Sequence, residues 1–304
     1  MNKSTNLMSN SQLSAVKNRF SAGELRFESR CLNGWDTLLL EEWSGYAPFQ
    51  DLDSWMKEPS SECVKDTPCR IILKSTTPHG VIYTKYMRAQ NDGVIQKNEI
   101  FPKLKWTFAP SRAQRILKTT AMMISLGHPC PRPLLGARRR GAFGYPHEIF
   151  IAMEVALPTA EDDFYSRNEA ERPDLIRLCG RRLAALHRDG FIHGDFLPRN
   201  ICPNWKDDNI FFLDNDRTKR HSIQMPFFLK RRNLAQFCFN LYLLAEQPVE
   251  SLIEAMVDSY AAELGWPDSR RSAENETIKQ QVNHRWSLHK TGELRRKHEQ
   301  QNKL

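Results

Sequence analysis

The spacing of apolar residues changes character near residues 155–165. Before this point, two strand-like segments at 69–74 and 81–87 flank a Pro-His-Gly turn, which predicts a β-hairpin. Apolar residues then recur at helical spacing over 111–126, after a serine that suits an N-cap and before a glycine. An apolar run over 148–155 predicts a further strand. The first half of the chain is therefore expected to form a small sheet with one helix.

The second half of the chain has mainly helical periodicity. A Pro-Asp pair opens a segment over 173–190 whose leucine, isoleucine and cysteine side chains fall on one face. A short strand is predicted at 209–213, and the pattern beyond Lys230 is helical nearly to the C-terminus. Strands followed by helices predict an α+β protein, with a small β-rich N-terminal lobe and a larger helical C-terminal lobe.

These patterns suggest how the chain is divided. We place the N-terminal lobe at 61–157 and the C-terminal lobe at 158–304. Residues 1–60 are treated as an N-terminal extension of unknown role, with a polar leader followed by a stretch that carries three tryptophans. The 304 residues suffice for two lobes, and 40% hydrophobic with 26% charged residues exclude disorder of the whole chain.

Charge and cysteine content limit the partners and the compartment. The net charge of +8 favours an acidic partner, which could be nucleic acid, an anionic membrane surface or a phosphorylated substrate. Seven scattered cysteines without a CxxC pair argue against a zinc site or a disulfide framework and fit a reducing cytoplasm. The N-terminus is polar, so no signal peptide is expected, and no run approaches the roughly 18 apolar residues that span a bilayer. Any membrane contact is expected to be peripheral.

The most informative stretch is His193-Gly-Asp-Phe-Leu-Pro-Arg-Asn200, followed by Phe-Phe-Leu-Asp214. Phosphoryl transfer needs a carboxylate that orients the acceptor hydroxyl, and oxygen ligands that hold Mg²⁺ against the nucleotide phosphates. Asp195 and Asn200 share one loop, and Asp214 ends an apolar strand that would deliver its carboxylate to the same place. The spacing predicts Asp195 as catalytic base and Asn200 and Asp214 as magnesium ligands. Any of them alone would be an ordinary turn residue, and His193 is expected to be structural.

The loop, the strand and the basic segment after them resemble the Kdo/WaaP lipopolysaccharide kinase family, a bacterial branch of the protein-kinase-like superfamily. The resemblance covers about residues 65–245 and implies a two-lobed kinase fold with ATP and Mg²⁺ as cofactors. Five further features carry it: Gly194 after the histidine, Leu-Asp-Asn-Asp-Arg at 213–217, Arg-Asn-Leu-Ala-Gln-Phe at 232–237, Ser-Arg-Ala at 111–113 and Pro-Arg-Pro at 131–133.

The resemblance also implies nucleotide-binding residues. Lys85 corresponds to the lysine that contacts the ATP phosphates, and Met153, Glu154 and Val155 correspond to the hinge strand whose backbone groups meet adenine. Two plainer interpretations stay open. Lys85 could be an edge-strand lysine that faces water, and residues 153–155 could be no more than a core strand.

Three departures from the family pattern bear on activity. Ile116 stands where the family usually has a glutamate that pairs with the lysine, and residues 111–126 contain no Asp or Glu. The stretch 61–80 has Gly80 as its single glycine, so the glycine-rich phosphate lid is missing or degenerate. Asn233 replaces a structural aspartate, a mild change because an amide still accepts a hydrogen bond. The first two keep a catalytically weak pseudokinase among the alternatives.

Basic clusters guide the choice of acceptor. They occur at 138–140, 219–220, 230–232 and 295–297, and their simplest interpretation is as solvated turns and helix faces. The segment from Lys219 to Arg232 nevertheless follows the metal-site strand, where the acceptor would bind in this fold. An anionic glycolipid at a membrane surface would suit it. No nucleic-acid motif accompanies the charge, so no nucleic-acid partner is expected.

The sequence thus predicts an ATP- and Mg²⁺-dependent sugar kinase that acts on Kdo or heptose of the lipopolysaccharide inner core. The expected location is the cytoplasm, with peripheral contact to the inner face of the inner membrane. One rival is a small-molecule phosphotransferase of the aminoglycoside or choline kinase type, which Asp216-Arg217 and the basic segment disfavour. The other rival is a pseudokinase that serves as a binding scaffold.

Overall fold

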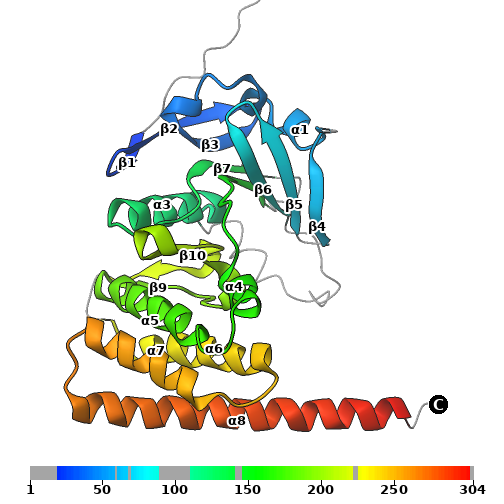
Figure 1. The fold of residues 1–304 in the computed structure, drawn as a ribbon. Helices are drawn as coiled ribbons and strands as arrows, with labels where there is room; N and C mark the ends of the chain where they lie inside the picture. Colours follow the sequence, from blue (N-terminus) through cyan, green and yellow to red (C-terminus); the bar gives the residue numbers. More distant parts are fainter. Residues whose placement is uncertain are drawn as a thin grey trace, which may run out of the picture. The chain divides into compact units, whose positions relative to one another are not determined.

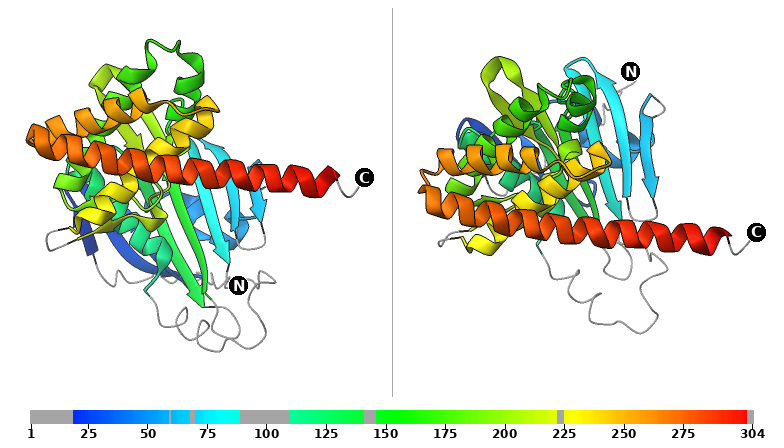
Figure 2. Two further views of the ribbon diagram at one scale, coloured as in Figure 1. Left: turned by 90° about the horizontal axis from the view of Figure 1, so that it is seen from below. Right: turned by 60° about the horizontal axis from the view of Figure 1, so that its bottom comes forward.

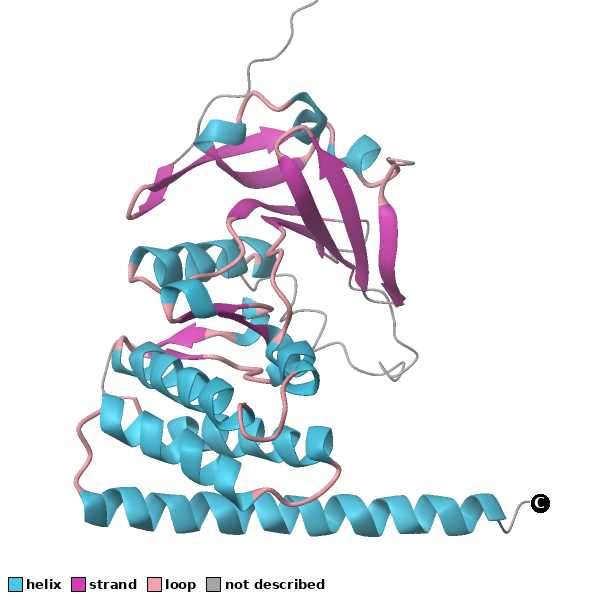
Figure 3. Ribbon diagram, viewed as in Figure 1, coloured by secondary structure: helices cyan, strands magenta, loops and turns pink. Residues whose placement is uncertain are grey.

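The computed structural model describes residues 19–58, 60–67, 70–88, 110–140, 146–221 and 225–301, with side chains to residue 292. The chain divides into two compact units: unit 1 is Met1–Leu117 with Pro133–Ala152, and unit 2 is Lys118–Arg132 with Met153–Leu304. Strands predominate in unit 1 and helices in unit 2 (Figure 3). The expected α+β class is confirmed. No described helix is both long and apolar enough to cross a membrane.

An eight-stranded sheet forms the body of unit 1, with the order β1-β2-β3-β7-β8-β6-β5-β4 (Figure 1). The pairs β1–β2, β2–β3, β3–β7, β7–β8, β5–β6 and β4–β5 are antiparallel. The strands are β1 (Arg19–Ala22), β2 (Leu25–Leu32), β3 (Trp35–Leu40), β4 (Glu62–Thr67), β5 (Arg70–Thr77), β6 (Gly80–Arg88), β7 (Pro133–Arg140) and β8 (Pro146–Met153). β5 and β6 are the predicted hairpin, with Thr77 paired to Gly80 across the turn.

The sheet crosses the boundary that the sequence places at residue 60. Strands β1 to β3 belong to the same sheet as β4 to β8. The three tryptophans without an assigned role are buried, and Phe49 contacts two of them, with ring centroids 5.4 Å from Trp43 and 5.5 Å from Trp55. Trp55 Nε1 also donates to Thr84 Oγ1 of β6 at 3.0 Å. Burial of large aromatic rings is a strong packing contribution, so residues 19–55 are integral to unit 1.

Helix α3 (Arg112–Ser125) agrees with the predicted helix and begins against the sheet. Its first turn packs Ala113 and Ile116 against Met87 of β6 and Phe150 of β8. The N–H of Ala113 donates to Glu148 Oε2 at 2.7 Å, so a buried carboxylate from β8 satisfies one of the unpaired donors at the helix N-terminus.

The sequence interpretation was wrong about the arginines at 138–140, which it placed in a solvated turn or on a helix face. They lie in strand β7 and not in a turn or on a helix face. Arg138 pairs across the strands with Asp36 and Glu148, and its side chain is largely buried. The Arg139 guanidinium lies 4.5 Å from the Trp35 ring centroid and 2.5 Å from an Asp53 carboxylate oxygen. Acidic and aromatic residues of the neighbouring strands and of α1 (Leu52–Trp55) thus lie against these charges within the strand.

Unit 2 is built from helices around one apolar core. The α-helices wholly in unit 2 are α4 (Ala160–Ser166), α5 (Arg172–Arg188), α6 (Phe227–Ala245), α7 (Glu250–Glu263) and α8 (Asp268–Gln301), and α1 (Leu52–Trp55) belongs to unit 1. Three short 3₁₀ helices among the described residues also belong to unit 2, namely η4 (Pro198–Asn200), η5 (Trp205–Asp207) and η6 (Asn215–Arg217), whereas η1 (Glu41–Trp43) and η2 (Ala47–Gln50) belong to unit 1. Helix α8 lies against α6 and α7, and its C-terminal end extends past them (Figures 1 and 2).

Close packing and two small sheets complete unit 2. α5 and α7 approach closely at Gly180, where a Cβ would lie 2.1 Å from Ser259 Oγ and 2.7 Å from the Met256 carbonyl oxygen. β9 (Phe191–Ile192) pairs with β12 (Lys219–Arg220), and β10 (Ile201–Asn204) pairs with β11 (Asn209–Phe212). The helix predicted over 173–190, the strand predicted at 209–213 and the helical region beyond Lys230 are thereby confirmed.

Candidate active site

Asp195 lies in the loop after β9, and two amides orient its carboxylate. Gln236 Nε2 of α6 donates to Asp195 Oδ1 at 3.2 Å. Asn200 Nδ2 donates to the backbone oxygen of Asp195 at 2.9 Å and to its Oδ2 at 3.3 Å. Asp195 is only half-buried, so its carboxylate is still reachable. A carboxylate held at both oxygens is suited to orient an acceptor hydroxyl and to take its proton.

The β10–β11 hairpin brings Asn200 and Asp214 to the same end. β10 begins directly after Asn200, and Ile201 pairs with Phe212 of β11. Leu213 N donates to Asn200 O at 2.8 Å, which ties the residue before Asp214 to residues 193–200, the predicted catalytic loop. The structure therefore brings the three predicted residues of unit 2 together.

The donor set of Asn200 and Asp214 fits Mg²⁺, which prefers oxygen ligands. Asn200 directs its amide nitrogen to Asp195, and no described group donates to its Oδ1. Asp214 is exposed and has a left-handed backbone, with φ 49° and ψ 55°, a conformation that Asp adopts more readily than most residues. No group of three or more His, Cys, Asp or Glu side chains able to hold a metal occurs in the described part of the chain. An ion at this site would take its other ligands from water and phosphate, as Mg²⁺ usually does.

A buried hydrogen-bond network holds the catalytic loop in place. His193 Nε2 donates to Leu213 O at 2.9 Å, and His193 Nδ1 accepts from Asp195 N at 3.3 Å. Asn233 Nδ2 donates to His193 O at 2.7 Å, while Asn233 Oδ1 accepts from His187 Nε2 at 3.0 Å. His193 thus has the structural position expected from the sequence. Asn233 uses both its donor and its acceptor, and an aspartate could not make the bond to His193 O.

Gly194 is required by close packing within the loop. A Cβ at this position would lie 2.2 Å from Arg217 Cβ and 2.5 Å from the Arg217 carbonyl oxygen. Arg217 belongs to the Asp-Asn-Asp-Arg segment that begins at Asp214, the predicted magnesium ligand. The glycine therefore lets this segment lie directly on the catalytic loop.

The chain matches a family model described as the lipopolysaccharide kinase (Kdo/WaaP) family over residues 53–260, which is more than half of its length. The chain belongs to this family. Membership in a kinase family implies phosphotransferase activity with ATP. A search of curated proteins gave no match.

Three solved structures are similar to this chain, and the first of them agrees with the assignment at the level of the fold. A structure of WaaP in complex with acyl carrier protein has a TM-score of 0.54 and 14% identity, over 81% of this chain and 98% of that chain. A crystal structure of WbdD has a TM-score of 0.43 and 16% identity, over 72% of this chain and 49% of that chain. Another, described as the bifunctional kinase-methyltransferase WbdD, has a TM-score of 0.42 and 15% identity, over 87% and 53%. The first of these confirms the protein-kinase-like fold.

Lys85 lies on the α3 side of the sheet in unit 1. Its strand β6 has β8 on one side and β5 on the other, so Lys85 is not on an edge strand. Because side chains alternate along a strand, Lys85 shares a face with Met87, which packs against Ala113 and Ile116 of α3. This position agrees with the family pattern, in which the lysine and the helix carboxylate meet on that face. Its contact with phosphate stays a prediction.

The departures from the family pattern have local structural explanations. Ile116 is buried at 2% exposure in the α3 cluster, so an apolar contact replaces the helix carboxylate. Of the stretch 61–80, which carries Gly80 as its single glycine, residues 68–69 between β4 and β5 lie outside the described residues.

Met153, Glu154 and Val155 are all half-buried. Met153 ends β8, and its N–H donates to Arg132 O at 2.9 Å. The contact of these three residues with adenine stays a prediction.

Gln236 is the site residue that the sequence did not single out. It lies three residues after Asn233 on α6, and residues at this spacing share one face of a helix. Asn233 contacts the backbone of His193 and Gln236 contacts the Asp195 carboxylate, so this face of α6 carries the catalytic loop. The helical spacing from Asn233 was the signal that could have identified it.

The buried histidines predict acid sensitivity of the fold. Burial lowers the pKa of His187 from 6.5 to about 3 and also lowers the pKa of His193. The unfolded chain would protonate both near 6.5, so below that pH the unfolded state binds more protons than the folded state. This contribution to stability is fully present above pH 6.5 and is lost as the pH falls towards the folded pKa, which for His187 amounts to about 1.4 kcal/mol per pH unit.

Urea denaturation at a series of pH values from about pH 7 to about pH 5 measures how the free energy of unfolding changes with pH. In His187→Gln the fall of unfolding free energy with falling pH should be shallower by the equivalent of about one proton, since His187 no longer contributes. Equal slopes in the wild type and the variant would contradict the neutral, buried state of His187.

Proposed function

We propose that this protein is an ATP- and Mg²⁺-dependent kinase that phosphorylates a hydroxyl of Kdo or heptose in the lipopolysaccharide inner core. Membership in the lipopolysaccharide kinase family supports the reaction class. The observation that carries the proposal is the grouping of Asp195, Asn200 and Asp214 around one loop and one hairpin end. This set offers a fixed carboxylate next to two oxygen ligands, as phosphoryl transfer requires.

Each residue has a distinct role in the proposed reaction. Asp195 orients the acceptor hydroxyl and accepts its proton while the sugar oxygen bonds to the γ-phosphorus and ADP leaves. Asn200 Oδ1 and the Asp214 carboxylate supply ligands to Mg²⁺, which when bound neutralises the developing phosphate charge. Lys85 contacts the phosphates, and the backbone of residues 153–155 meets adenine.

Positive charge supports an anionic glycolipid acceptor at the inner face of the inner membrane. The chain carries a net charge of +8, and anionic surfaces attract nearby lysine and arginine side chains. Within the basic segment Arg231 is already engaged, because it forms two 2.8 Å hydrogen bonds to the Glu274 carboxylate. Arg232 is exposed and is better placed to meet an acceptor.

A pseudokinase is the second candidate, and one observation favours it. The buried Ile116 removes the helix carboxylate that usually pairs with the phosphate-binding lysine. Such a protein would bind nucleotide with little turnover. A small-molecule phosphotransferase would share the catalytic residues and differ only in its acceptor.

Transfer of labelled γ-phosphate distinguishes these functions. Purified lipopolysaccharide core, an aminoglycoside and choline are offered in parallel, and label is expected in the lipopolysaccharide core alone. Label confined to a small cationic acceptor would favour the small-molecule phosphotransferase. No label in any acceptor, with ATP still bound, would favour the pseudokinase.

A further inference from the structure

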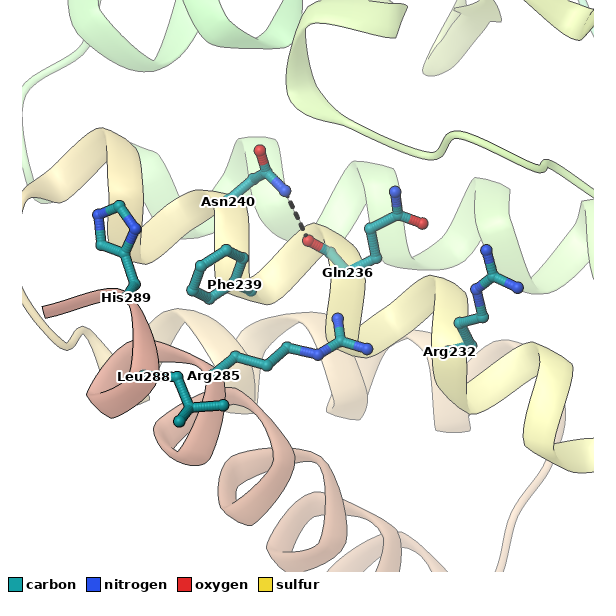
Figure 4. Close-up of a pocket in the computed structure, with 7 residues that line it drawn as sticks. All are labelled: Arg232, Gln236, Phe239, Asn240, Arg285, Leu288 and His289. Carbon is teal, nitrogen blue, oxygen red and sulfur yellow. Dashed lines mark hydrogen bonds between the residues drawn. The ribbon is translucent and has the colours of Figure 1, made fainter. Parts of the chain in front are cut away.

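Unit 2 contains a pocket of ≈ 590 Å³ between α6 and α8, next to the catalytic loop. Its volume is in the range of small-ligand sites. Four residues of α6 and three of α8 line it, as Figure 4 shows: Arg232, Gln236, Phe239, Asn240, Arg285, Leu288 and His289. All seven lining residues lie within these two helices, which pack against each other, so the walls of the pocket are formed by regular structure.

Gln236 connects this pocket to the catalytic carboxylate. Its side chain lines the pocket, and its Nε2 donates to Asp195 Oδ1 at 3.2 Å. Gln236 Oε1 is buried without a hydrogen-bond partner in the described part of the chain. Because an unsatisfied buried oxygen costs folding free energy, stability alone does not explain a glutamine here. A molecule in the pocket would lie one side chain away from Asp195.

The pocket is cationic, and its arginines are available. None of the seven lining residues is acidic. Arg232 and Arg285 are exposed, and neither forms an ion pair with a described residue, whereas the neighbouring Arg231 is paired with Glu274. In Figure 4 the Arg285 side chain extends along α6 toward Gln236. Guanidinium groups of this kind bind carboxylate or phosphate through paired hydrogen bonds.

We propose that this pocket binds the acceptor through a carboxylate or phosphate group on the sugar and thereby places the acceptor hydroxyl at Asp195. Arg232 and Arg285 contact the anionic group, and Phe239 and Leu288 supply apolar surface for the sugar ring. The consequence for catalysis rests on the proposed kinase function. Binding of the sugar does not depend on turnover and can be tested separately.

Equilibrium binding of deacylated lipopolysaccharide inner-core oligosaccharide to the full chain tests the pocket. The double variant Arg232→Ala, Arg285→Ala should bind it about tenfold or more weakly, since charge-assisted hydrogen bonds are lost. The control double variant Arg26→Ala, Lys206→Ala removes two exposed charges that lie on β2 and η5. It should bind like the wild type. Melting temperatures of both variants establish that they are folded.

Two further arms identify the group that is recognised. Oligosaccharide treated with phosphatase and oligosaccharide with its carboxyl groups reduced are each compared with the untreated probe. The group that matters is the one whose removal weakens binding to the wild type but not to the pocket variant. Arg232→Lys, Arg285→Lys should recover part of the affinity, because lysine keeps the charge without the paired donors.

Three results would overturn the pocket assignment. They are wild-type affinity in the pocket variant, equal weakening in both double variants, or no binding of the oligosaccharide to the wild type. The effect of the pocket variant on phosphate transfer is measured separately from oligosaccharide binding. Where transfer occurs, the pocket variant should raise the KM for the acceptor about tenfold with little change in kcat. Oligosaccharide binding that depends on the arginines without any phosphate transfer would overturn the kinase proposal and leave the pocket standing.

Discussion

Replacing Asp195 with asparagine should lower the rate of phosphoryl transfer at least about a hundredfold, the usual contribution of a general base. The variant keeps the shape of the side chain, and its amide oxygen can still accept the hydrogen bond from Gln236 Nε2. It loses the carboxylate that takes the proton of the acceptor hydroxyl. Nucleotide affinity should change little, because Asp195 is not one of the proposed metal ligands and contacts Asn200 through its Nδ2, not through the Oδ1 proposed for Mg²⁺.

The measurement is kcat for transfer to lipopolysaccharide core, together with ATP affinity from equilibrium titration. Asp207→Asn is a matched control, since it neutralises an exposed carboxylate of η5 that contacts Asn204. The control should keep both wild-type values. Equal loss of rate and of nucleotide binding in Asp195→Asn would show a structural role instead of a catalytic one.

Features encoded by neighbouring residues were predictable from the sequence. The β5–β6 hairpin, α3 and α5 follow from local periodicity with turn or cap residues at their ends. The catalytic loop and its hairpin were also predictable, because Asp195, Asn200 and Asp214 lie within twenty residues and a short hairpin fixes their proximity.

Features made by distant contacts were not predictable. Strands β1 to β3 join a sheet whose other strands come later in the chain, and β3 pairs with β7, about a hundred residues away. Gln236 reaches Asp195 from 41 residues along the chain, and Glu148 reaches Ala113 from 35. The pocket needs Arg232 and Arg285 on two helices whose packing the sequence pattern does not specify. Local periodicity predicts an element and its buried face but not the element that packs against it.

Replacing Asp214 with asparagine should abolish most of the Mg²⁺-dependent stabilisation by ATP. In the wild type ATP should raise the melting temperature only when Mg²⁺ is present, because ligand binding stabilises the folded state by RT ln(1 + [L]/Kd). At a ligand concentration of about a hundred times Kd this amounts to about 2.7 kcal/mol. The neutral amide is a much weaker magnesium ligand than a carboxylate. Asparagine is chosen because position 214 has φ 49°, which Asn and Asp both tolerate, so the variant should fold normally.

The thermal shift is measured with ATP alone, Mg²⁺ alone and both together, at saturating concentrations for the wild type. Asp207→Asn again serves as the control, and it should keep the full shift, because Asp207 lies in η5 and contacts Asn204. A variant melting temperature without ligand close to that of the wild type would establish that the backbone at position 214 is intact. A Mg²⁺-dependent shift in Asp214→Asn as large as in the wild type would show that this carboxylate does not bind the metal. The magnesium site would then have to be sought elsewhere, since Asn200 Oδ1 alone is too weak a ligand to hold Mg²⁺ against ATP.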